Sequence, residues 1–203
     1  MPRRWPLALL ALYVAGAVAA FLAFPTQPNY DSLTALLWGR ELVQDGVVPA
    51  FDAYRAPTQH PLLLAFGIAV SPLGDAAARL WVLICVLSMP ALAAAMWRLG
   101  GAAAGVLAAA LAAALVASRL NLSLLASIGF LDIPYCALVA WAAALEAERP
   151  RRGGAVWALL ALGGLLRPEA WVLAAVYAVW IGWPLPWAGR ARAVALAAVA
   201  PVT

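Results

Sequence analysis

The chain has 203 residues, of which 67% are hydrophobic and 11% are charged. Because a soluble domain has about 25% charged residues, this chain has too few charges to keep its surface in water, and lipid is the expected solvent for most of it. The basic residues are all arginine. In a membrane protein, basic residues are explained by their role in fixing cytoplasmic loops. The excess of arginine therefore does not indicate nucleic-acid binding, and we expect no nucleic-acid partner. The alanine- and arginine-rich composition is also associated with GC-rich bacterial genomes.

The chain begins with an apolar run at residues 5–24, which follows Arg3 and Arg4. The run is about 20 residues long, enough to cross roughly 30 Å of hydrocarbon, and no small-residue cleavage site of a signal peptide follows it. We therefore predict an uncleaved first span. Further apolar runs predict spans at residues 80–97, 102–117, 131–147, 154–166 and 170–187, and an incomplete span at 193–203.

The short run at residues 61–73 decides the topology. Prolines bound it, and we predict that it lies in the membrane interface or re-enters it without crossing. Eight of the thirteen arginines then lie inside, including those at 149–152, as the positive-inside rule requires. The sequence thus predicts an all-α membrane protein: a polytopic transmembrane helix bundle in the inner (plasma) membrane, with a cytoplasmic N-terminus and with residues 1–203 in a single transmembrane domain.

The first outer loop, residues 25–60, contains a predicted surface helix. Residues 32–44 repeat with helical periodicity, with leucines on one side and charged residues on another. The leucines are Leu33, Leu36 and Leu37. This pattern predicts an extracytoplasmic amphipathic helix that lies on the membrane, with Asp31 or Ser32 as its N-cap.

Two details of the apolar runs concern packing. Gly101 and Gly105 are spaced four residues apart at the start of a predicted span, which predicts the close approach of another helix. Cys85 and Cys136 both lie in apolar stretches. We therefore expect two buried thiols and no disulfide.

The candidate functional groups lie on the predicted outer side. Asp31 and Asp132 can each be explained as helix caps, but a carboxylate at membrane depth is costly and is a functional candidate by default. A partly desolvated Asp31 could act as a general base. Arg167 could snorkel and pair with Glu169, or it could point into a cavity and bind phosphate.

Other motifs are few. His60 is the only histidine, and a lone histidine is more often a hydrogen-bonded structural group than a metal ligand, so we predict no metal site. The chain has no Walker loop, dinucleotide fingerprint or nucleophile elbow. The sequence therefore contains none of the motifs that would indicate energy-coupled transport or serine hydrolysis.

Taken in order, the motifs resemble those of the GT-C superfamily of polytopic membrane glycosyltransferases, especially its protein O-mannosyltransferase and aminoarabinose-transferase branch. The matching stretches are residues 29–31, 38–49, 59–63, 131–134 and 163–169. Two departures leave the sugar open. His60-Pro61 stands where the family has two prolines, and Ser32 stands where a second acidic residue follows the first.

The resemblance implies a glycosyltransferase of the cell envelope that moves a sugar from a polyprenyl-phosphate donor to a glycan, lipid or protein acceptor on the extracytoplasmic side. Asp31 would be the catalytic base, and Asp132 would orient the donor or acceptor, or hold a divalent metal if the enzyme uses one; no cofactor is certain. The implied residues for substrate or phosphate binding are Arg167, Glu169, His60, Arg55 and Arg119.

Two other functions stay open. A transporter or flippase for a lipid-linked molecule would show paired broken helices in two halves, and the sequence shows no such repeat. A non-catalytic membrane scaffold would use Asp31 and Asp132 only to cap helices. Because the chain ends inside an apolar run and the family has more spans, we expect an N-terminal fragment that is inactive alone.

Overall fold

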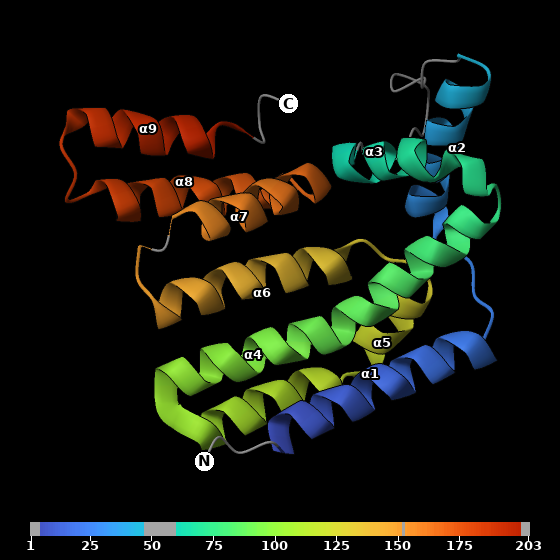
Figure 1. Cartoon of the computed structure of the whole chain (residues 1–203), viewed down its shortest axis with the longest axis horizontal. Coiled ribbons are helices and arrows are strands. Elements are labelled where there is room, and N and C mark those ends of the chain that lie inside the picture. Colours follow the sequence, from blue (N-terminus) through green and yellow to red (C-terminus); the bar gives the residue numbers. More distant parts are fainter. Residues whose placement is uncertain (1–4, 47–59, 152, 200–203) are drawn as a thin grey trace.

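The computed structural model describes residues 5–46, 60–151 and 153–199, and within these ranges the chain is helical, with no strand. The helices pack in sequence: α4 against α1 and α6, α6 against α7, α7 against α8, and α8 against α9 (Figure 1). The elements are α1 (Trp5–Ala23), α2 (Tyr30–Gln44), α3 (Pro61–Val70), a 3-10 turn (Ser71–Leu73), α4 (Ala76–Ala117), α5 (Leu120–Ser127), α6 (Asp132–Glu148), α7 (Gly154–Leu166), α8 (Glu169–Gly182) and α9 (Trp187–Ala197).

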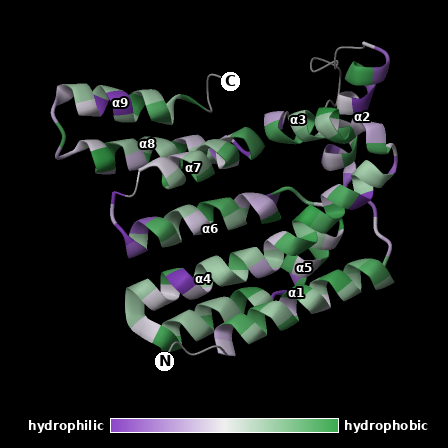
Figure 2. Cartoon of the chain, viewed as in Figure 1, coloured by the Kyte–Doolittle hydropathy of each residue, from purple (hydrophilic) through white to green (hydrophobic). Residues whose placement is uncertain are grey.

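Length and hydropathy identify the helices that could cross a membrane. In the described part of the chain, α1 and α4 are long and apolar enough, and α5 with α6 would be a third span if the pair, bent by 119°, is one broken span. Helices α3, α7 and α8 are apolar but shorter. Figure 2 shows hydrophobic residues along most of the long helices, and hydrophilic residues on α2, near helix ends and within α4 and α9. The fold is therefore that expected of a helical membrane protein.

Helix α4 contains a reversal that joins two of the predicted runs. Ala104 (φ −148°, ψ 22°) and Gly105 (φ 81°, ψ −170°) are not helical, and the chain turns back there, so that residues 106–117 return beside residues 76–103 (Figure 1). A Cβ atom on Gly100 would lie 2.7 Å from the Ala108 carbonyl oxygen. The expectation that Gly101 and Gly105 admit another helix is wrong, because Gly105 supplies the positive φ of this turn and Gly100 makes the close contact.

Helices α2 and α3 form a pair at one end of the molecule (right in Figure 1). A Cβ atom on Gly39 would lie 2.6 Å from the Gly67 carbonyl carbon, so the two backbones meet at these glycines. The ten residues of α3 extend about 15 Å, half of a hydrocarbon core of roughly 30 Å. Together with the 3-10 turn, α3 covers residues 61–73, the bounds of the predicted run, and its path relative to the membrane stays a prediction.

The predicted N-cap of α2 is wrong, and its predicted leucine side is divided between a buried Leu36 and an exposed Leu37. Its N-cap is Asn29, whose side chain accepts a hydrogen bond from the Ser32 backbone N–H at 3.3 Å, so neither Asp31 nor Ser32 caps the helix. Its buried face is Ser32, Ala35, Leu36 and Gly39. Leu37 is 44% exposed, because the face that packs on α3 contains the small residues that allow close contact.

The core of the described structure has three clusters, the smallest of which joins α4, α5 and α6 around Met89, Ala126 and Ile133. One cluster joins α6 to α9 around Trp157 and Tyr177, and another joins α2, α3, α4, α6 and α7 around Leu63, Trp81 and Cys85. Cys85 is buried as predicted, but Cys136 is exposed. The apolar stretch around Cys136 is helical, and the thiol lies on its outward face.

Helix α1 contacts the rest of the molecule near its two ends and at Tyr13, which packs against a cluster of Met89, Ala126 and Ile133. At its start, the rings of Trp5 and Trp97 pack edge to face with centroids 5.0 Å apart. At its end, Arg79 donates hydrogen bonds to the carbonyl oxygens of Phe21 (2.8 Å) and Thr26 (3.1 Å). Arg79 thus satisfies a carbonyl that the last turn of a helix leaves without a partner. No residue of α1, described over its whole length, is buried.

Candidate functional site

Three of the predicted site residues occupy equivalent positions at the starts of helices. Asp31, Asp132 and Glu169 lie in the first turns of α2, α6 and α8, and no other helix in the described ranges has an acidic residue there. A helix N-terminus carries a partial positive charge that favours a carboxylate. The N-cap of α6 is Leu131, so Asp132 follows the cap position and is not the cap.

Hydrogen bonds hold the start of α2 against the turn that precedes α6. The Asn29 backbone N–H donates to the Ile128 carbonyl at 2.7 Å. The Ser32 hydroxyl and the Trp81 indole N–H both donate to the Gly129 carbonyl at 2.8 Å. These contacts bring the first turns that carry Asp31 and Asp132 to the same end of the molecule.

Arg167 joins the starts of α6 and α8. It ends α7 with an extended backbone (φ −147°, ψ 131°), and its Nη1 donates to the Asp132 carboxylate across 35 residues of sequence. Its Nη2 and Nε donate to the two carboxylate oxygens of Glu169 at 3.0 and 3.3 Å. The predicted local pair with Glu169 is therefore confirmed, and Asp132 is a second partner that the sequence did not reveal.

The electrostatics of this cluster follow from its one cation and two anions. The hydrogen bond from Arg167 lowers the pKa of the Glu169 carboxyl below its usual 4.5. The side chains of Arg167 and Asp132 are 31% and 29% exposed, and that of Glu169 is 56% exposed. The Arg167–Asp132 pair is thus the more shielded of the two ion pairs.

His60 fixes the chain next to Arg167. It is 7% exposed, and its Nδ1 lies 2.8 Å from the Leu166 carbonyl oxygen. Because a carbonyl only accepts hydrogen bonds, Nδ1 is protonated and donates. His60 is therefore a hydrogen-bonded group that ties the start of α3 to the end of α7, one residue before Arg167.

The remaining predicted residues are not brought into this cluster. Arg119 lies at the start of α5, and no contact joins it to the cluster in the described part of the chain. Arg55 lies outside the described residues. Within the described ranges, no group of three or more His, Cys, Asp or Glu side chains is placed to hold a metal ion.

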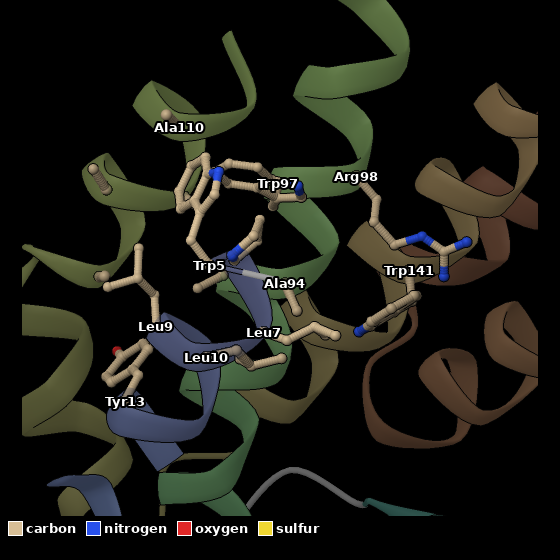
Figure 3. Close-up of a pocket in the computed structure, with 15 residues that line it drawn as sticks. Trp5, Leu7, Leu9, Leu10, Tyr13, Ala94, Trp97, Arg98, Ala110 and Trp141 are labelled. Atoms are coloured by element: carbon tan, nitrogen blue, oxygen red, sulfur yellow. The ribbon is translucent and has the colours of Figure 1, made fainter. Parts of the chain in front are cut away.

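Two apolar cavities flank α1. One, of 620 Å³, lies between the first half of α1, both arms of α4 and Trp141 of α6 (Figure 3). The other, of 690 Å³, lies between the second half of α1, α4 and α5, and its lining includes Thr26 and Ser127. Tyr13 lines both cavities, and its hydroxyl is buried without a hydrogen-bond partner in the described structure. The sequence did not single out Tyr13, although it is a polar residue in an apolar run.

The four helix starts at this end of the molecule, those of α2, α3, α6 and α8, are thus connected through Gly129, Asp132, Arg167 and Leu166. Such a site offers carboxylates and one guanidinium, which suits the recognition of an anion beside a polar reactant. Comparison of the chain with protein-family models, with curated proteins and with solved structures finds no match.

Proposed function

We propose that the protein is a membrane-embedded glycosyltransferase of the GT-C type, which transfers a sugar from a polyprenyl-phosphate donor to an acceptor at the end of the molecule where α2, α6 and α8 begin. The observation that carries this proposal is the cluster of Asp132, Arg167 and Glu169, which adjoins the helix start that carries Asp31. Charged groups are expensive in a mostly apolar helical protein, and such groups are commonly functional.

The chemistry of the reaction requires two kinds of group. A lipid phosphate is a good leaving group, so the enzyme needs a cation for the departing phosphate and a base for the acceptor hydroxyl. Arg167 is the cation, because a guanidinium binds phosphate oxygens through two parallel hydrogen bonds. Asp132 holds that guanidinium in place from the start of α6.

Asp31 is the proposed base. Of the three carboxylates in the first turns of helices, Asp132 and Glu169 are paired with Arg167. No hydrogen bond or ion pair of the Asp31 side chain occurs in the described structure. A carboxylate without an internal partner has its lone pairs available to accept the proton of an acceptor hydroxyl, which supports this role.

The cavity of 690 Å³ beside α1 is the proposed place for the polyprenyl chain. It is lined mostly by apolar side chains, and it reaches Thr26 and Ser127, which lie close in sequence to the contact between Asn29 and Ile128. A volume of this size falls within the roughly 300–1,000 Å³ usual for small-molecule sites. A lipid tail bound there would have its phosphate near the end that carries Arg167.

The decisive test is transfer of radiolabelled sugar from a polyprenyl-phosphate donor in membranes that contain the full-length protein, as the wild type or as Asp31→Asn. Loss of a general base lowers the rate by about 100- to 10,000-fold. Asp45→Asn is the matched control, because it removes the same charge at the exposed C-cap of α2 and should leave transfer unchanged. Undiminished transfer by Asp31→Asn would refute the assignment of the base.

A further inference from the structure

The two edges of the Arg167 guanidinium have different partners. The edge formed by Nε and Nη2 faces both oxygens of Glu169, at 3.3 and 3.0 Å. Nη1 instead donates to Asp132. The Nε–Nη2 edge is a rigid pair of donors that fits two oxygens of a carboxylate or of a phosphate equally well. Glu169 therefore occupies the surface of Arg167 that a phosphate would use.

Of the two carboxylates, Glu169 is the one that can leave. Its side chain is 56% exposed, compared with 29% for Asp132, so it can be rehydrated when it turns away. An exposed ion pair contributes little to stability, whereas separating a more shielded pair leaves a charge without compensation. Displacing Glu169 is thus the less costly change, and Asp132 would continue to hold Nη1.

The charge of the cluster also favours displacement of Glu169 by a phosphate. Two carboxylates around one guanidinium leave a net negative charge, which repels a phosphate. Once Glu169 has turned away, Arg167 and Asp132 are neutral together, and the positive N-termini of α6 and α8 still favour an anion.

We propose that Glu169 is a displaceable internal anion, which occupies the Nε–Nη2 edge of Arg167 in the empty site and is exchanged for the phosphate group of a lipid phosphate when the ligand binds. This inference rests on the phosphate-binding role of Arg167 in the proposed function. It reverses the role that the sequence predicts for Glu169, since a ligand-binding residue strengthens binding and a displaced residue weakens it.

The experiment is a calorimetric titration of the purified chain in detergent with farnesyl phosphate, a short polyprenyl phosphate. Glu169→Gln removes the competing charge and should bind farnesyl phosphate about two- to fivefold more tightly than the wild type, the factor that corresponds to an exposed ion pair. Glu169→Ala should show the same gain. Asp75→Asn, which removes an equally negative exposed group paired with Arg40, should bind as the wild type does.

Two further arms identify the group that exchanges. Inorganic phosphate should show the same gain on Glu169→Gln, and farnesol, which lacks the phosphate, should show none. The gain should disappear when Arg167→Gln is added, because the competition takes place on that guanidinium.

Unchanged or weaker binding of farnesyl phosphate by Glu169→Gln would overturn the inference, as would a gain that survives Arg167→Gln or one that also occurs with farnesol. Failure of the glycosyltransferase proposal would look different. Tighter binding by Glu169→Gln, with no sugar transfer by the full-length wild type, would refute the proposed reaction and leave the exchange at Arg167 intact.

Discussion

The contact between α2 and α3 leads to a prediction about Gly39. A Cβ atom there would lie 2.6 Å from both the Gly67 carbonyl carbon and the Ile68 nitrogen, whereas non-bonded atoms of this kind prefer about 3.5–4.0 Å. Both obstructing atoms belong to the backbone, so the two helices must separate by about 1 Å. Overpacking of this kind costs about 1–3 kcal/mol, and alanine returns up to about 1 kcal/mol through its helix propensity.

Because both obstructing atoms are backbone, the upper part of this cost, about 2–3 kcal/mol, applies. After the propensity gain we expect Gly39→Ala to lose roughly 1–2 kcal/mol, or about 2–8 °C in melting temperature for a chain of this length. The measurement is thermal unfolding in detergent, followed by the fluorescence of the ten tryptophans. Gly16→Ala is the matched control: Gly16 lies within α1 and has no atom within 4 Å of its added Cβ. Its melting temperature should stay the same or rise.

The effect should extend to the candidate site, because α2 carries Asp31 and the start of α3 carries His60. Sugar transfer should therefore fall in Gly39→Ala and not in Gly16→Ala. A melting temperature for Gly39→Ala equal to or above that of the wild type would show that α2 and α3 do not meet backbone to backbone, and the described placement of both helices would be wrong.

Three further predictions concern other contacts. Arg79→Ala should lower the free energy of unfolding by about 1.5–3 kcal/mol, because the carbonyls of Phe21 and Thr26, at and just beyond the end of α1, lose a charged donor. Chemical denaturation measures this change, and an unchanged free energy of unfolding would show that α1 is held by other contacts. Because the pKa of Glu169 is lowered in the folded protein, its pairing with Arg167 stabilises the fold above pH 4.5, and this stabilisation is lost as the pH falls through the lowered pKa. The difference in melting temperature between the wild type and Glu169→Gln should therefore be full at neutral pH and vanish in acid. A difference that grows in acid would contradict the pairing. In sealed cells, an impermeant thiol reagent should label Tyr30→Cys and not Arg149→Cys in a cysteine-free background, and the reverse pattern would invert the predicted topology.

The positions of the helices follow from the sequence more closely than their ends and connections do. Hydropathy predicts α1 and α7 to within one residue, because an apolar run with polar flanks marks where a helix can be buried. It predicts residues 80–97 and 102–117 as two successive spans, but it does not show that the reversal between them falls at Ala104 and Gly105, where Gly105 has a positive φ. It also gives no separate helix for α5, whose residues lie in a predicted connection.

In the candidate site, the sequence predicts the contact between near neighbours but not the contacts between residues far apart in the chain. The Arg167–Glu169 pair joins residues two positions apart, so sequence alone predicts it. The bond between Arg167 and Asp132 and the bond between His60 and Leu166 span 35 and 106 residues. Contacts of that separation depend on how the helices pack, and no property of the single residues encodes them. The resemblance between motifs indicated which residues to compare, but not which of them touch.

The way α1 is attached bears on how the protein is made. Its partners, Arg79 and Trp97, are synthesised well after α1 itself, and at about 5–20 residues per second several seconds separate the two events. Throughout that interval the newly made α1 would reside in the bilayer as a lone hydrophobic segment. Its surface is compatible with that interval, since no residue of α1 is buried as a whole in the folded protein. The edge-to-face ring contact of Trp97 and the hydrogen bonds of Arg79 would then form with a helix that is already inserted, before the later helices α5 to α9 are complete.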